Sequence, residues 1–141
     1  YIGSQLVGAT LGALTLATII PNALEGGLGS HALGSDISVW QGLLTEIVLT
    51  FILVFVIFST AMDPRGPVHI APFAIGFAVA IDIFMGLPLT GASMNPARTL
   101  GPALVTGQWA DHWVYWIGPA VGAVLAALLY HHIFMPKENR E

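Results

Sequence analysis

The sequence predicts an all-α membrane protein, and three observations lead to that fold class. Hydrophobic residues make up 55% of the 141 residues and charged residues only 9%, whereas about 25% of a soluble domain is charged. Four apolar stretches are each long enough to cross a bilayer as a helix, which takes roughly 17–25 residues. A shorter apolar stretch after Asn95 and Pro96 fits a helix that enters the membrane only halfway.

The four long stretches are Tyr1–Ile20, Val39–Ala61, Ile70–Leu87 and Trp113–Met135. Tryptophans lie near their ends, as in an interfacial aromatic belt. The first stretch opens inside an apolar run, without an initiator methionine or a signal-peptide pattern. We therefore expect the chain to be the C-terminal part of a longer protein.

Basic residues predict which ends of these helices are cytoplasmic. Arg65 lies in the connection 62–69, and two more basic residues lie in the tail 136–141, whereas the connection 21–38 has none. Because Lys and Arg are enriched on the cytoplasmic side, we expect 62–69 and the C-terminus inside and 21–38 outside.

The connection 88–112 must then leave and return on the outer face. It contains the apolar helical run Pro96–Val105, which at 1.5 Å per residue is about half a bilayer long. A re-entrant half-helix satisfies both constraints, and a helix lying on the membrane surface is the alternative.

An internal repeat is suggested by two of the apolar stretches: the first begins YIGSQLVGATLGAL, and the last contains YWIGPAVGAVLAAL. Copies separated by three helices would cross in opposite directions, as in the inverted repeats of transport proteins. Small residues at every fourth position let helix backbones approach closely, and such generic packing is the alternative explanation. These small residues are Ser4, Gly8 and Gly12 in the first copy and Gly118, Gly122 and Ala126 in the second.

The start of the short helix carries the polar chemistry. Asn95 fits the N-cap and Pro96 the first helical position. In a re-entrant segment this N-terminus would point its unpaired N–H groups and positive dipole end at the membrane centre, which requires a polar pore. Arg98 lies one turn further, and an arginine in a membrane normally faces water or a partner.

The stretch GASMNPARTLGPAL, followed by HWVYWIGPAVGAVLAALLY, resembles the second half of an aquaporin, of the major intrinsic protein family. TEIVLTFILVF resembles the family's fourth membrane helix and IAPFAIGFAVA its fifth. The resemblance covers the whole chain. It implies the third to sixth helices of a right-handed helical bundle, plus one re-entrant half-helix.

The resemblance also implies a passive water channel that excludes protons and ions, with this chain as half of the pore. Asn95 would donate its amide to a permeating water, while Pro96 and Ala97 complete the Asn-Pro-Ala motif. The other roles are a selectivity filter of Ile83, Ala92 and Arg98, an acceptor ladder of the Gly91, Ala92 and Ser93 carbonyls, and a buttress at Glu46.

Solute range is open at this point. Ile83 stands where strict water channels commonly have histidine, so ammonia, urea, glycerol or hydrogen peroxide are alternative permeants. In contrast, Thr99, Ala103, Tyr115 and Trp116 resemble the water-selective branch. The filter residue of the second membrane helix is absent from the chain.

The remaining polar residues are assigned structural roles. We expect Asp82 to face a neighbouring helix rather than the pore, and His69 and the pair His131-His132 to be loop or interfacial residues. His31 and His112 are interpreted as loop residues with no functional group around them. No cofactor, metal site or enzyme motif is expected.

The expected partners are water, the lipid bilayer and, from the resemblance, three further copies in a homotetramer; no basic patch suggests nucleic acid. The protein is expected to be a multi-pass integral membrane protein of the plasma or vacuolar membrane. A secondary transporter and a structural membrane-junction protein are alternatives. A transporter would need acidic ion ligands, and Glu46 and Asp82, the acids within the spans, lie outside the motif.

Overall fold

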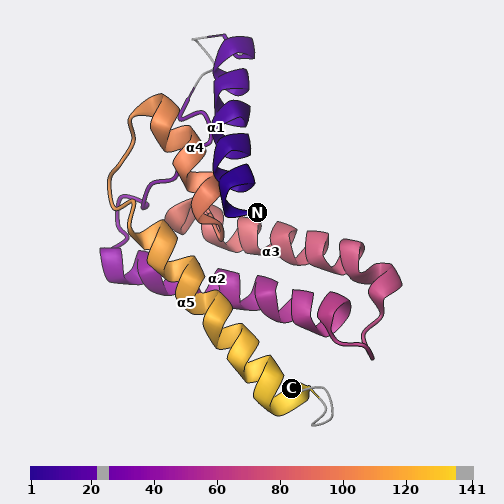
Figure 1. The fold of residues 1–141 in the computed structure, drawn as a ribbon. Coiled ribbons are helices and arrows are strands. Elements are labelled where there is room, and N and C mark those ends of the chain that lie inside the picture. Colours follow the sequence, from indigo (N-terminus) through magenta and orange to yellow (C-terminus); the bar gives the residue numbers. More distant parts are fainter. Residues whose placement is uncertain (22–25, 136–141) are drawn as a thin grey trace.

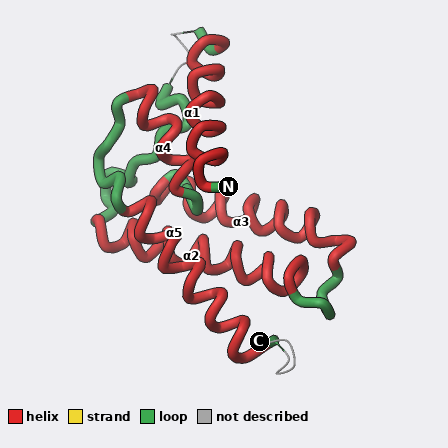
Figure 2. The backbone as a smooth tube through the Cα atoms, viewed as in Figure 1, coloured by secondary structure: helices red, strands yellow, loops and turns green. Residues whose placement is uncertain are grey.

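The computed structural model describes residues 1–21 and 26–135, and all regular structure in these ranges is helical (Figures 1 and 2). The predicted tail 136–141 lies outside the described residues. Four helices are long and apolar enough to cross a membrane, which confirms the predicted fold class. The α-helices are α1 (Ile2–Ile19), α2 (Val39–Ile57), α3 (Ala71–Thr90), α4 (Pro96–Thr106) and α5 (Val114–Leu129).

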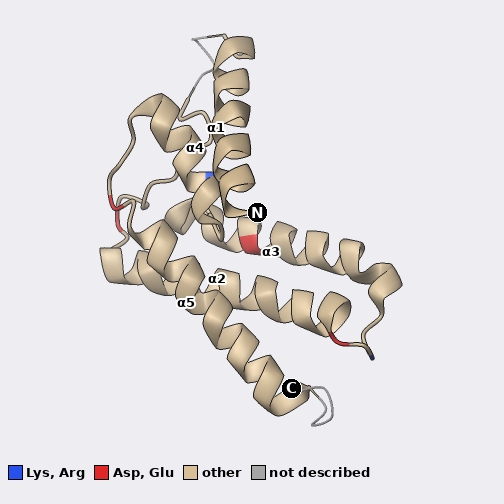
Figure 3. Ribbon diagram, viewed as in Figure 1, with Lys and Arg blue, Asp and Glu red and all other residues tan. Residues whose placement is uncertain are grey.

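Short turns extend three of the long helices. A π-helical turn, η2 (Phe58–Met62), continues α2, and another, η4 (Tyr130–Phe134), continues α5. A 3₁₀ turn, η3 (Val68–Ile70), leads into α3. Figure 3 shows charged residues mostly in the loops, with few on the helices, as burial in lipid requires.

Helices α2, α3 and α5 pack together as one group (Figure 1). A capping box begins α2, in which the Ser38 backbone N–H donates to the Gln41 side chain at 2.8 Å. Side-chain contacts run in the same order along α2 and α5, so these two helices are parallel. Thus Trp40 stacks edge-on with Trp113 at their N-terminal ends, and Phe55 meets Tyr130 at the other ends.

Two glycines bring α5 close to α2. A Cβ at Gly118 would come within 2.6 Å of the Glu46 Cβ, and one at Gly122 would collide with the Ile47 carbonyl oxygen. The predicted small-residue face of the last span is therefore a helix contact, where only a missing side chain permits this backbone approach.

The turn 63–67 ties the far ends of α2 and α5 together. The Asp63 carboxylate accepts hydrogen bonds from the Arg65 side chain at 2.7 and 3.0 Å and from the Tyr130 hydroxyl at 2.8 Å. Arg65 also donates to the Phe134 carbonyl at 2.5 Å. The loop with Arg65 and the end of the last span therefore lie at the same end of the bundle.

Helix α3 runs three residues beyond Leu87, where we expected the span to end. Pro88 cannot donate to the Phe84 carbonyl, but the helix continues past it until Gly91 takes the left-handed conformation at φ 83°. The Leu89 carbonyl, which lies in the last turn and has no partner within the helix, accepts the backbone N–H of Gly34 at 2.9 Å. The longer helix carries Thr90 to the site described below.

Helix α1 packs against α4, with Gly101 of α4 in close contact with the backbone of Ala9. The predicted small-residue face of α1 behaves differently from that of α5. A Cβ at Gly8 or Gly12 would meet no atom within 4 Å, because this face borders an open groove instead of a helix.

The α2–α5 contact makes a testable prediction. Gly122→Ala should lower the free energy of unfolding by about 1–3 kcal/mol, since the new methyl group would overlap the α2 backbone. The matched control, Gly76→Ala in α3, adds a methyl group to open space and should be neutral or stabilising by up to about 1 kcal/mol. Thermal unfolding of the complete protein in detergent measures both; equal stability of the two variants would contradict the packing.

Candidate functional site: a half-helix beginning beside two grooves

The half-helix α4 begins at Asn95 as the sequence predicted. The Asn95 side-chain oxygen accepts the backbone N–H groups of Ala97 at 2.9 Å and Arg98 at 3.4 Å, and Pro96 occupies the first turn. The helix ends at Gly107, which has φ 74°. Because the Asn95 oxygen is used as the cap, its amide NH₂ group is left to point away from the helix.

The segment 91–113 leaves and returns at the same end of the bundle. The Tyr115 hydroxyl, in the first turn of α5, donates to the Thr90 carbonyl at the end of α3 at 3.0 Å. Figure 1 shows α4 rising from this region and lying alongside α1. The chain therefore makes an excursion between α3 and α5, and α4 does not cross with them.

A buried carboxylate holds the backbone just before α4. One Glu46 oxygen accepts from the Thr90 hydroxyl at 2.7 Å and from the Ser93 N–H at 2.9 Å, and the other accepts from the Met94 N–H at 2.8 Å. Glu46 has no exposed surface. One side chain of α2 thus satisfies three donors of the segment.

This segment adopts a strained conformation. Ala92 and Met94 have φ of 55° and 54°, the left-handed region, which costs a non-glycine residue about 1–2 kcal/mol. The Ala92 N–H is bonded to the Thr90 hydroxyl at 3.1 Å, and the Asn95 N–H to Ser93 Oγ at 3.3 Å. With the two Glu46 bonds, four consecutive backbone donors have partners, which irregular backbone within a membrane requires.

Arg98 folds back over the same segment. Its Nη1 donates to the Ala92 carbonyl and lies 3.3 Å from the Ser93 carbonyl, so two of the three carbonyls expected in the acceptor ladder contact this guanidinium. The third, at Gly91, belongs to the residue that ends α3. The guanidinium is thereby tethered to the wall of the site.

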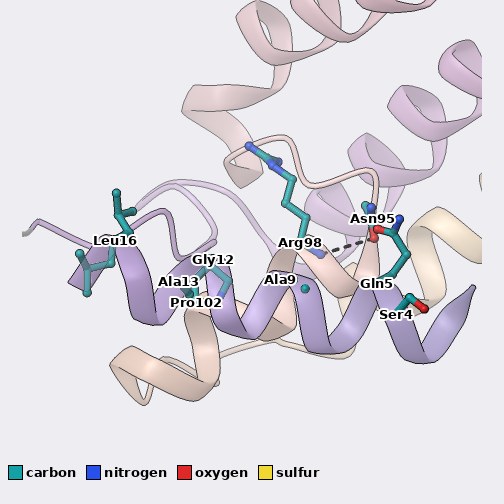
Figure 4. A pocket seen from close by; sticks show the side chains of 11 residues that line it. Ser4, Gln5, Ala9, Gly12, Ala13, Leu16, Asn95, Arg98 and Pro102 are labelled. Atoms are coloured by element: carbon teal, nitrogen blue, oxygen red, sulfur yellow. Dashed lines mark hydrogen bonds between the residues drawn. The ribbon is translucent and has the colours of Figure 1, made fainter. Parts of the chain in front are cut away.

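Two grooves meet at Asn95 and Arg98. One, of about 390 Å³, runs between α1 and α4 and also contains Gln5 and Gly12 (Figure 4). The other, of about 220 Å³, is lined by α2, α3 and the segment before α4, and includes Ile83. The predicted residues Asn95, Arg98 and Ile83 therefore share one groove, whereas Ala92 is fully buried beneath it.

His31 is the residue that the sequence interpretation missed. We expected a loop histidine with nothing around it, but it is only 6% exposed and its Nε2 lies 2.9 Å from Arg98 Nη1. Burial, the Arg98 charge and His112 together lower the pKa of His31 to about 4. Gly34 lies in the loop 26–38, and its backbone N–H donates to the Leu89 carbonyl at the end of α3. This glycine was the signal in the sequence that the loop folds inward.

Asp82 and His112 lie away from the two grooves. Asp82 is fully buried, does not line either groove, and its carboxylate has no hydrogen-bond partner among residues 1–21 and 26–135. The His112 ring packs edge-on against Trp109 and is tilted against Trp116, and burial lowers its pKa. Within the same described ranges, no group of three or more metal-ligating side chains occurs.

Comparison with known proteins identifies the family. The sequence profile described as Major intrinsic protein matches residues 1–130. The chain is 46% identical over 142 residues to Aquaporin TIP4-4 of Zea mays, and the match covers 100% of the chain and 56% of that protein.

Two further relatives agree. The chain is 50% identical over 141 residues to Probable aquaporin TIP3-2 of Arabidopsis thaliana, covering 99% of the chain and 52% of the relative. It is 45% identical over 137 residues to Aquaporin-4 of Rattus norvegicus, covering 96% and 42%. The chain spans about half the length of these relatives and corresponds to their C-terminal portion. It therefore belongs to the major intrinsic protein family of membrane channels.

Proposed function

We propose that this chain forms half of a passive water pore that excludes protons and ions. The observation that carries the proposal is the half-helix N-terminus: Asn95, Arg98 and Ile83 line one groove, beside a backbone segment whose N–H groups are already paired. Such a site offers a permeant a few fixed donors along an apolar wall.

The two polar side chains would act at different steps. The Asn95 oxygen is occupied by the cap, so its NH₂ group is free to donate to the oxygen of a passing water. The α4 dipole adds positive potential at the same point, which orients that water and opposes proton transfer. Arg98 would repel cations and donate to water, as the outer part of a filter with Ile83 and Ala92.

Several supporting roles follow from the contacts. The three hydrogen bonds of Glu46 support its role as the buttress of the Asn-Pro-Ala segment. The carbonyls of Gly91, Ala92 and Ser93 would present acceptors to water next to Arg98.

By the positive-inside rule, the Arg65 turn would face the cytoplasm, and α4 would enter from the outer side. Assembly as a homotetramer is part of the proposal.

Small neutral solutes are a second candidate permeant because Ile83 gives the filter an apolar wall. An isoleucine in place of a histidine removes a donor and widens the filter, so ammonia, urea, glycerol and hydrogen peroxide could pass as well as water. Vesicles given a urea or glycerol gradient should re-swell at the rate of empty vesicles if the filter is strict, and faster if it is permissive.

A passive channel and a coupled transporter differ in what drives them. Both Glu46 oxygens are engaged by Thr90, Ser93 and Met94, and Asp82 lies outside the two grooves around Asn95, which leaves neither placed to bind a coupling ion there. Water flux under an osmotic gradient alone supports a channel. Flux that needs an ion gradient would support a transporter.

Asn95→Asp separates capping from permeation. Aspartate caps a helix as well as asparagine does, but it lacks the amide donor. In the complete protein, water permeability should fall roughly tenfold, since one hydrogen bond of about 1.4 kcal/mol corresponds to that factor.

Arg98→Ala should admit protons and small cations. Stopped-flow light scattering and a proton-flux dye measure both effects in proteoliposomes.

Gln108→Ala is the matched control because it removes an exposed amide outside the grooves; its water permeability should equal that of the wild type. If Asn95→Asp and Arg98→Ala conducted water and excluded protons like the wild type, the pore assignment would be wrong.

Glu46→Gln tests the buttress. A glutamine has one acceptor oxygen, so either the Met94 N–H or the Ser93 and Thr90 donors would face an NH₂ group. Leaving a buried donor unpaired costs about 1–3 kcal/mol, and we expect thermal stability and water permeability to fall together. Asp36→Asn changes an exposed carboxylate in the same way and should have no effect. Wild-type stability in Glu46→Gln would contradict the role.

A further inference from the structure

The loop before α2 places an imidazole in a fitted position beside the filter. Besides Arg98, His31 contacts Thr99, whose Oγ1 lies 3.1 Å from its Nδ1. The Tyr115 ring lies 5.5 Å away between centroids. A Cβ at Gly91 would come within 2.8 Å of the His31 ring, so only glycine leaves room for it there.

Arg98 determines which His31 nitrogen carries the proton. A guanidinium only donates and stays protonated in proteins, so Nε2 must accept and Nδ1–H must donate to Thr99. The Thr99 hydroxyl then donates to Ser93 Oγ, 2.5 Å away, and Ser93 donates to the Asn95 carbonyl at 2.9 Å. Donor and acceptor are therefore fixed in every hydrogen bond of the chain that leads from Arg98 through His31, Thr99 and Ser93 to Asn95.

We propose, building on the water-pore function above, that His31 is an acid switch that positions Arg98. The neutral imidazole holds the guanidinium against the wall, and the protonated imidazole releases it. An imidazolium donates from both nitrogens, so two cationic donors would then face each other at 2.9 Å. Arg98 loses one acceptor and shifts toward the groove, which is the side left open.

Each charged or titratable group around His31 either opposes a positive charge on the imidazole, is neutral, or is already hydrogen-bonded elsewhere. Arg98 on α4 and His112 before α5 both oppose a positive charge on the imidazole. Tyr115 on α5 contributes a neutral ring. Glu46 on α2 is the acid near Arg98, and its oxygens are taken up by the segment before α4.

Acid therefore favours release of the Arg98 guanidinium from His31. A solvated imidazole titrates near 6.5, whereas the buried His31 has its pKa lowered to about 4. The docked state, in which neutral His31 holds Arg98, is fully favoured above pH 6.5. Its stability relative to the released state falls as the pH drops from 6.5 to about 4, and below about 4 it falls no further. The largest change in the docking equilibrium is roughly 300-fold.

The test compares His31→Asn with the wild type in the complete protein. An asparagine amide can donate to Thr99 in place of Nδ1–H, and it does not titrate. Water permeability is measured in proteoliposomes held at the same pH on both sides, from about pH 7.5 to about pH 4. We expect a reversible fall of roughly threefold or more in the wild type, a flat profile in His31→Asn, and a wild-type profile in the matched control His69→Asn, which changes an exposed histidine of η3 outside both grooves.

The tautomer is checked independently by ¹⁵N NMR of histidine-labelled wild-type protein at neutral pH. The expected spectrum has His31 protonated at Nδ1 and unprotonated at Nε2. An Nε2-protonated His31, an acid response retained in His31→Asn, or a wild-type profile without an acid response would overturn the switch and leave the water pore standing. Absence of water flux at every pH would overturn the pore, and this inference with it.

Discussion

The Glu46 carboxylate is the interaction on which the rest of the site depends. A chain can break its helix inside a membrane only if the freed backbone groups find partners within the protein. Glu46 accepts from Thr90, Ser93 and Met94, and without it the left-handed residues before α4 would carry both strain and unpaired donors. This anchor allows α4 to begin at Asn95.

Glu46 can hold this segment because helices α2, α3 and α5 position its carboxylate and its partners. Glycines at 118 and 122 let α5 approach the α2 backbone on either side of Glu46, and α3 continues past Pro88 far enough to present Thr90. The turn at Asp63 fixes the opposite ends of α2 and α5. The group of α2, α3 and α5 is therefore a frame, and the groove-lining residues lie on the segment that it holds.

Sequence reasoning predicted the helices because their signals are local. Hydropathy gave the spans, and the cap at Asn95 and Pro96 gave the start of α4. The parity of the basic loops predicted that the segment returns to the membrane face it left, which stays a prediction; the structure itself places Tyr115 in contact with the Thr90 carbonyl. His31 was missed because its burial comes from residues far apart in sequence, Gly91 and Arg98, and a single loop histidine carries no such signal. The helical residues after Pro88 were missed because a proline near a C-terminus need not end the helix.

The central claim is that α4 enters from the outer side and that its N-terminus borders the water path. A single cysteine at Ile83, in a cysteine-free version of the complete protein, tests it most directly, since this chain contains no cysteine of its own. A membrane-impermeant thiol reagent added to the outer side should modify that cysteine and block osmotic water flux. Modification that left the flux unchanged, or reaction only from the side of the Arg65 turn, would contradict the account.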